Sequence, residues 1–228
     1  MVMQQFTAAN ARPLPVILML DTSGSMSVNG NIDAMTQAVN NMIRSFSQES
    51  QVKAEIQLSI ITFGGNTAEL HTPLTPVALF AEDDKPLVFQ AEGMTPLGSA
   101  LELVQALIED KEQIPNRAYK PTIVLVSDGY PNDSWQDAFT SLQNSERAKK
   151  AVRMAMAIGR EADEDMLTSF INDPETPLFK AENSTEIQRF FRAVSISVRR
   201  RSGSNNPNQV SSVDYAAVED EMFDDLED

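Results

Sequence analysis

Two serines and an aspartate in one short polar segment are the residues of this sequence best suited to binding chemistry. The segment reads Asp21-Thr22-Ser23-Gly24-Ser25-Met26 and supplies one carboxylate and two hydroxyl groups, the hydroxyls on alternate positions. Carboxylate and hydroxyl oxygens are hard ligands, and hard ligands suit Mg²⁺ or Mn²⁺. We therefore predict that a divalent metal ion binds at this segment.

The elements around this segment are typical of an α/β sheet. An unbroken apolar run covers residues 16–20, and three- and four-residue apolar spacing begins at Ile32. A strand that is apolar on both faces is expected at the centre of a parallel sheet, where helices cover both sides. Ligands of open α/β sheets bind in the crevice at the carboxyl ends of the strands. The metal segment is therefore expected at that edge of the sheet.

The rest of the chain alternates between strand and helix patterns. Strands are predicted at residues 14–20, 55–63, 122–126, 154–158 and 178–181, with short extended pieces at 67–71 and 87–90. Helices are predicted at residues 32–46, 97–108, 133–150, 165–171 and 184–198. This alternation predicts a doubly wound, mostly parallel sheet with helices on both faces.

Two further loops carry oxygen ligands. Thr95 precedes Pro96, so it is predicted to cap the helix that follows, and Asp128 follows the apolar strand at 122–126. If that strand lies beside the strand at 14–20, Asp21 and Asp128 approach the same point. Neutral hydroxyl ligands leave a metal ion electrophilic, so it would bind an acidic residue of another protein. The predicted metal ligands are Asp21, Ser23, Ser25, Thr95 and Asp128.

The composition excludes several classes of protein. The chain of 228 residues has no cysteine, which excludes disulfides and thiolate metal sites and fits a reducing compartment. Its formal net charge of −15 argues against nucleic acid or an anionic membrane as partner. His71 is the single histidine, and nothing near it in the sequence supports zinc catalysis or a Ser-His-Asp triad. No signal peptide or membrane-spanning run is recognised, so a cytoplasmic protein is expected.

The chain is predicted to have three parts. Residues 1–13 form an N-terminal arm, residues 14–200 the folded domain, and residues 201–228 a flexible linker and an acidic tail. The tail from residue 211 contains eight of the 33 acidic residues. Three hypotheses for it stay open: a solvated segment, a segment that folds on a partner, and an internal source of carboxylates for the metal.

The segment at 21–26, with Thr95 and Ser127-Asp128-Gly129 at their spacing, resembles the metal-ion-dependent adhesion site of von Willebrand factor A domains. The resemblance covers about residues 14–198. It implies one antiparallel edge strand in the sheet, the same five metal ligands, and Mg²⁺ as the metal, with Mn²⁺ or Ca²⁺ as alternatives. It also implies that the flanking residues contact the partner. These flanking residues are Gly24, Met26, Gly93, Met94, Gly129 and Tyr130.

The run at 14–21 and the short chain look most like the bacterial tellurium-resistance (TerY-like) branch of that family. This resemblance implies an adaptor in a stress-response or signalling system, with a kinase or phosphatase as partner. A non-enzymatic interaction module is therefore the predicted function, because no nucleophile or substrate pocket is recognised. The alternative is a metal-assisted phosphoryl or ester hydrolase that uses Asp21 or Asp128 as its base.

Overall fold

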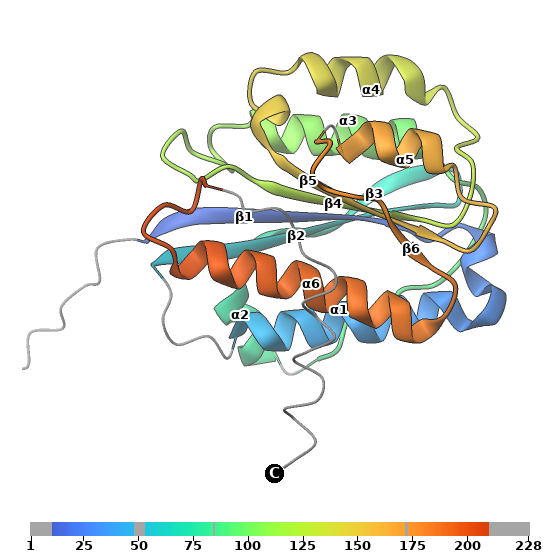
Figure 1. Ribbon diagram of the computed structural model, residues 1–228, viewed down its shortest axis with the longest axis horizontal. Coiled ribbons are helices and arrows are strands. Elements are labelled where there is room, and N and C mark those ends of the chain that lie inside the picture. The colour runs from blue at the N-terminus through green and yellow to red at the C-terminus, as the bar shows by residue number, and fades with distance from the viewer. Residues whose placement is uncertain (1–10, 48–52, 84, 172, 210–228) are drawn as a thin grey trace, which may run out of the picture.

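A six-stranded sheet lies between two layers of helices (Figure 1). The computed structural model describes residues 11–47, 53–83, 85–171 and 173–209. The strands are β1 (Arg12–Asp21), β2 (Ala54–Gly64), β3 (Thr67–Pro76), β4 (Thr122–Ser127), β5 (Val152–Ile158) and β6 (Phe179–Ala181). Their order is β3-β2-β1-β4-β5-β6, and only β3 runs antiparallel to its neighbour. The predicted fold class is therefore confirmed, including the antiparallel edge strand.

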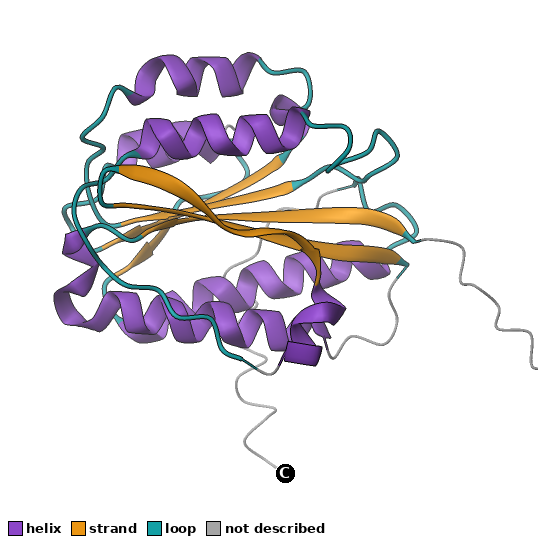
Figure 2. Ribbon diagram, turned by 180° about the vertical axis from the view of Figure 1, so that it is seen from behind, coloured by secondary structure: helices purple, strands orange, loops and turns teal. Residues whose placement is uncertain are grey.

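Helices cover both faces of this sheet, as Figures 1 and 2 show from opposite sides. One layer contains α1 (Asn31–Ser47), α2 (Val77–Asp83) and α6 (Ser184–Gly203). The other contains α3 (Leu97–Glu109), α4 (Trp135–Asn144) and α5 (Glu164–Ile171). Two short 3₁₀ segments, η1 (Gly24–Gly30) and η2 (Ala148–Lys150), complete the described elements. None of the helices in the described ranges has the length and apolar character needed to cross a membrane.

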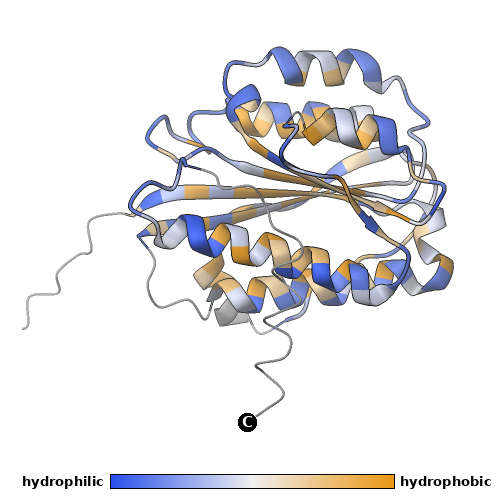
Figure 3. Cartoon of the chain, viewed as in Figure 1, coloured by the Kyte–Doolittle hydropathy of each residue, from blue (hydrophilic) through white to orange (hydrophobic). Residues whose placement is uncertain are grey.

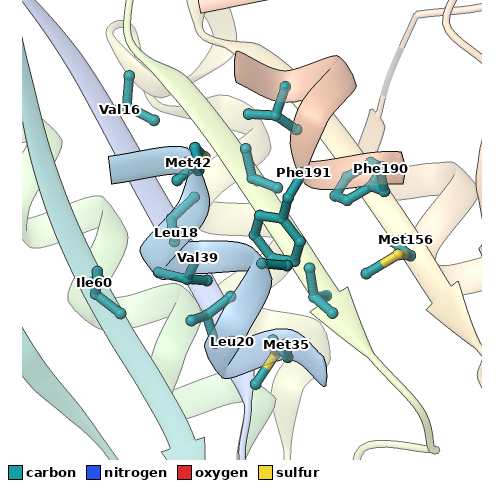
Figure 4. Packing of buried hydrophobic residues seen from close by; sticks show 14 of the residues in the cluster. Val16, Leu18, Leu20, Met35, Val39, Met42, Ile60, Met156, Phe190 and Phe191 are labelled. Atoms are coloured by element: carbon teal, nitrogen blue, oxygen red, sulfur yellow. The ribbon is translucent and has the colours of Figure 1, made fainter. Parts of the chain in front are cut away.

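Strand β1 divides its apolar side chains between two cores. Leu18 and Leu20 pack with Met35 and Val39 of α1 and with Phe191 of α6 (Figure 4). Ile17 and Met19 point to the opposite core, under α3, α4 and α5. Alternate residues of a strand point to opposite faces, so a strand that is apolar throughout must be covered on both sides. Figure 3 shows the resulting pattern, with apolar strands between helices that are polar outside.

Several element boundaries differ from the prediction. Strand β3 continues to Pro76, and helix α2 follows it without having been predicted. Residues 87–90 form no strand, and the side chain of Asn40 on α1 binds the backbone of Leu87. Its Oδ1 accepts from Leu87 N at 2.9 Å and its Nδ2 donates to Leu87 O at 2.9 Å. The helix predicted at 133–150 is divided into α4 and η2.

The C-terminal end of the domain lies beyond the predicted boundary at residue 200. Helix α6 continues to Gly203, and the side chains of Arg201 and Ser202 are buried. Arg201 Nε donates to Pro207 O at 2.9 Å, and Lys120 N donates to Asn208 Oδ1 at 2.8 Å. Residues 201–209 therefore belong to the folded domain and are not a free linker. Strand β1 likewise begins at Arg12, inside the predicted arm; residues 1–10 and the acidic tail from 210 lie outside the described residues.

Candidate metal centre

Asp21 joins the loop after β1 to the end of β4. It is the last residue of β1, and its side chain is fully buried. Its Oδ1 accepts a hydrogen bond from Ser23 N at 2.9 Å, and its Oδ2 accepts one from Ser127 Oγ at 2.5 Å. The second bond joins residues 106 positions apart in the chain, so Asp21 connects the two strand ends that carry the predicted ligands.

The predicted ligands on these two loops are in direct contact. Ser23 Oγ lies 3.0 Å from Ser25 Oγ, and Ser25 Oγ donates to Asp128 Oδ1 at 2.7 Å. They meet because β1 and β4 are adjacent parallel strands, with Leu20 paired to Val126, so their carboxyl ends lie side by side. The predicted convergence of Asp21 and Asp128 is present in the structure.

Thr95 is brought to the same edge by backbone contacts. Its N–H donates to Asn132 Oδ1 at 2.8 Å, and its carbonyl accepts from Asn132 N at 3.2 Å. The loop before Thr95 is joined to the segment at 21–26, because Gly24 N donates to Gly93 O at 3.1 Å. The Thr95 side chain is buried, and its hydroxyl forms no hydrogen bond with the residues that the structure describes. The hydroxyl is therefore free to serve as a ligand.

The prediction that Thr95 caps helix α3 is wrong. The helix begins at Leu97, and the capping position forms no side-chain hydrogen bond. The carboxylate of Asp133 caps it instead: Oδ1 accepts from Gly98 N at 3.0 Å and Oδ2 from Ser99 N at 3.2 Å. A negative side chain at a helix N-terminus binds unpaired N–H groups and interacts favourably with the helix dipole.

Removing this carboxylate should destabilise the helix that follows Thr95. We expect Asp133→Ala to lower the free energy of unfolding by about 1 kcal/mol, the usual contribution of an N-terminal cap. Urea unfolding followed by circular dichroism measures the change. Glu102→Ala, at an exposed interior position of α3, is the control and should change the stability by less than about 0.5 kcal/mol. Equal losses in both variants would contradict the capping role.

The two carboxylates of the site are held in an unfavourable electrostatic environment. Burial raises the pKa of Asp21, and the hydrogen bonds from Ser127 and Ser23 oppose the shift only in part. Burial also raises the pKa of Asp128 to about 6; the hydrogen bond from Ser25 lowers it, and the nearby charge of Asp21 raises it. Among the described residues neither carboxylate forms an ion pair. A bound cation would offset both the burial and the mutual repulsion.

The oxygen ligands fit a hard divalent cation. They comprise two carboxylates and three hydroxyl groups, and the described ranges contain no cluster of three or more His, Asp or Glu side chains that could hold a metal. A softer metal with nitrogen or sulfur ligands therefore has no site of that kind in the described part of the chain. Asp21, Ser23, Ser25, Thr95 and Asp128 would hold the ion, which would act as a Lewis acid toward an incoming anion.

The predicted contact residues around the ligands divide into two groups. Met94 and Tyr130 are 50% and 65% exposed, Gly93 is exposed, and Gly24 and Gly129 are half-buried. Met26 differs, because its side chain is fully buried in the core beneath α1 and cannot contact a partner. Val28, which was not predicted, is 56% exposed in the same loop. The 3₁₀ turn of η1 points residue 26 inward, and the non-helical backbone at residue 28 ends that turn.

Two glycines allow the turn between β2 and β3 to touch the loop before Thr95. Gly65 and Gly93 form a bridge in which Gly65 N donates to Glu92 O at 2.7 Å and Met94 N donates to Gly65 O at 2.9 Å. A Cβ on Gly93 would lie 2.5 Å from Gly65 Cα, and Gly93 has a positive φ of 63°. Both observations require glycine at position 93.

The fold brings carboxylate and hydroxyl groups from three loops to one edge of a mostly parallel sheet, and this defines a class of α/β proteins that bind ligands at that edge. The model of the von Willebrand factor type A domain family matches residues 16–193, and the chain belongs to this family.

Solved structures agree on the fold. The proximal thread matrix protein 1 of the mussel byssus has a TM-score of 0.64 and 16% identity, over 82% of this chain and 48% of its own. A further structure of that protein has a zinc-occupied MIDAS (metal-ion-dependent adhesion site) motif. It has a TM-score of 0.62 and 17% identity, over 81% of this chain and 45% of its own. A von Willebrand factor type A protein from Catenulispora acidiphila has a TM-score of 0.61 and 15% identity, over 82% of this chain and 42% of its own.

This chain thus spans about half the length of these structures. No curated protein sequence matches it.

Proposed function

We propose that this chain is a metal-dependent protein–protein interaction module. A divalent ion held by Asp21, Ser23, Ser25, Thr95 and Asp128 would bind an acidic residue of a partner protein. One observation carries the proposal: a continuous line of contacts runs from Ser23 Oγ through Ser25 Oγ to Asp128 Oδ1, across the ends of β1 and β4. Three of the five ligands are neutral hydroxyls, so the ion keeps enough positive charge to attract a further carboxylate.

The surface around these ligands supports an interaction with another protein. The described residues include six exposed large apolar side chains, and three of them, Val28, Met94 and Tyr130, lie on the loops that carry the ligands. Apolar and aromatic side chains that gather at one place on a surface mark an interaction site. A partner would therefore meet a metal ion within an apolar rim.

Mg²⁺ is the metal that we propose, with Mn²⁺ or Ca²⁺ as alternatives. The donor atoms are all oxygens, which suit these ions. The zinc described for the mussel protein belongs to that protein, but it supports the view that this kind of site holds a divalent ion.

For the cellular role we propose an adaptor in a bacterial stress-response or signalling system, in the cytoplasm, with a kinase or phosphatase as partner. The support is the resemblance of the run at 14–21 and of the short chain to the TerY-like branch of the family. Nucleic acid and membranes are not proposed as partners, because the charge of the chain is strongly negative.

Metal titration of site variants tests the proposal. In calorimetry with Mg²⁺, we expect Ser25→Ala to weaken binding about tenfold and Asp128→Asn about 100-fold, because the first removes a neutral ligand and the second a charged one. The matched controls are Ser169→Ala and Asp137→Asn, which remove the same groups from exposed helix positions. Capture of a partner that is insensitive to chelator and survives Asp128→Asn would contradict a metal bridge.

The alternative function is a metal-assisted hydrolase. The contact from Ser25 Oγ to Asp128 Oδ1 is the observation that favours it, because a carboxylate that accepts a hydroxyl proton can act as a base. Assays with p-nitrophenyl phosphate and p-nitrophenyl acetate in Mg²⁺ separate the two functions. The interaction module predicts no turnover above that of Asp128→Asn.

A further inference from the structure

A groove extends from the loops that carry the predicted metal ligands along the edge of the sheet formed by β2 and β3. It consists of two adjoining cavities of about 250 and 410 Å³, which share Gly64, Thr67, Glu69 and Glu92. The smaller cavity also reaches Thr22, His71 and Val88, whereas the larger one ends at Gly93. We call it the Glu69–Glu92 groove.

This groove is joined to the metal loops by the backbone. Thr22, the residue after the ligand Asp21, donates from its N–H to Phe63 O at 3.0 Å and accepts from Glu92 N at 2.8 Å. Gly93, at the end of the larger cavity, accepts from Gly24 N at 3.1 Å. The distance between the groove and the metal ligands is thus held by hydrogen bonds between loops. A molecule that binds both would have to match this spacing.

The groove has uncompensated negative charge. Glu69 and Glu92 are exposed, and neither forms an ion pair with the residues that the structure describes. No Lys or Arg of the described residues lines either cavity. His71 packs edge-on against Phe89, with ring centroids 5.1 Å apart, and burial lowers its pKa, although the charge of Glu69 opposes the shift. The histidine is therefore mostly neutral near pH 7 and leaves both carboxylate charges in place.

A hydroxyl group without a hydrogen-bond partner, on a side chain that is more than nine-tenths buried, gives independent evidence for a ligand. The side chain of Thr22 is only 7% exposed, lines the smaller cavity and lies over Gly64, whose Cβ would be 2.6 Å from Thr22 Oγ1. Within the described part of the chain this hydroxyl forms no hydrogen bond, and it is not among the fully buried atoms, so it can be reached from the cavity. A hydroxyl group that lines a cavity and has no protein partner can bond to a group that enters the cavity. Next to two carboxylates, a positively charged N–H donor would satisfy it best.

We propose that the Glu69–Glu92 groove binds a lysine or arginine side chain of the same partner protein whose acidic residue binds the metal. The inference rests on the proposed function and adds the chemistry of the partner. A long basic side chain would place its N–H groups between Glu69, Glu92 and the Thr22 hydroxyl, with its methylenes against Val88.

The groove would select between acidic partners. A partner with one acid for the metal and one base at the matching distance gains both contacts. A partner with a second acid in place of the base would bring like charges together at Glu69 and Glu92, which costs binding energy. The metal alone would accept either partner, so specificity would come from the groove.

Synthetic peptides test this selection. The probes are acetylated, amidated glycine peptides that carry one glutamate and one lysine, with the lysine one to four residues before or after the glutamate, and matched peptides with norleucine for lysine. In saturating Mg²⁺, we expect one spacing at which the lysine peptide binds about tenfold more tightly than its norleucine match, the size of a charge-assisted contact. The Glu69→Gln/Glu92→Gln double variant should abolish this difference.

The matched control is Glu102→Gln/Glu112→Gln, which removes the same charge from exposed positions outside the groove and should keep the preference for lysine. A wild-type protein that binds lysine and norleucine peptides equally at every spacing would overturn the proposal. So would a preference for lysine that is unchanged in the double variant of the groove.

A second experiment tests the groove without the metal. Butylammonium is titrated into the chelator-treated protein while amide resonances are followed by NMR. We expect the amide resonances of residues 64–71 and 88–92 to shift. These shifts should be smaller in Thr22→Val and absent in the Glu69→Gln/Glu92→Gln variant. If the wild-type protein shows no shifts at these residues, the groove proposal is refuted. Mg²⁺-dependent binding of glutamate peptides without a preference for lysine would refute the groove but keep the metal bridge. Binding of the glutamate peptides that does not depend on Mg²⁺, with the preference for lysine retained, would refute the bridge and keep the groove.

Discussion

Gly93→Ala is expected to lower the free energy of unfolding by about 3 kcal/mol or more and to weaken Mg²⁺ binding at the same time. The added methyl group would lie 2.5 Å from Gly65 Cα and 2.9 Å from Gly65 N, so backbone atoms must move. Backbone at positive φ adds about 1–2 kcal/mol for a residue with a Cβ, and overpacking adds about 1–3 kcal/mol. Because Gly24 N donates to Gly93 O, the shift would also displace the loop that carries Ser23 and Ser25.

Gly159→Ala is the matched control for this substitution. Gly159 has a similar φ of 71°, but a Cβ there would have no atom within 4 Å. We expect a loss of about 1 kcal/mol and unchanged Mg²⁺ affinity. Urea unfolding and calorimetry of both variants separate the backbone cost from the cost of the contact between loops. Similar losses of stability and of Mg²⁺ affinity in the two variants would show that the contact between Gly65 and Gly93 does not position the loops that carry the predicted ligands.

Arg201→Met should cost about 3 kcal/mol of stability. The guanidinium is buried and donates to Pro207 O at 2.9 Å, Thr122 Oγ1 at 2.5 Å and Lys120 O at 2.7 Å. Burial lowers its pKa to about 10, so the group is still charged at neutral pH. Its removal leaves buried oxygen atoms without donors, and losing part of a buried charged network typically costs 3–5 kcal/mol.

The neighbouring residue supplies the control. Arg200→Met changes the same side chain at an exposed position of α6 and should alter stability by less than about 0.5 kcal/mol. Truncation after residue 200 should destabilise the domain at least as much as Arg201→Met, because it also removes the backbone bond from Lys53 N to Ser202 O. Full stability of the truncated protein would instead support the boundary predicted from the sequence.

Much of the fold was predictable because the information is local. The apolar run at 16–20 must be buried on both faces of its strand. The three- and four-residue apolar spacing after Ile32 is that of an amphipathic helix. The convergence of Asp21 and Asp128 was predictable as well. It follows from a topological rule, since adjacent parallel strands end at the same edge of the sheet.

Other features depended on residues far apart in the chain. The local pattern Thr95-Pro96 favours a cap by Thr95, but Asp133 reaches the same N–H groups from another loop and leaves the threonine hydroxyl free. Composition alone makes residues 202–208 a linker, yet the buried Arg201 holds them against the sheet.

By itself, then, the sequence determined the order of the strands and of every helix except α2, the type of sheet, and the edge that Asp21 and Asp128 share. The tertiary structure alone decided that Met26 points into the core, that Ser127 supports Asp21, and that Glu69 and Glu92 line one groove. The physical reason is the separation in sequence of the residues that interact. Periodic patterns report which face of an element is buried, whereas a hydrogen bond or a cavity depends on the distance between segments that no local pattern encodes.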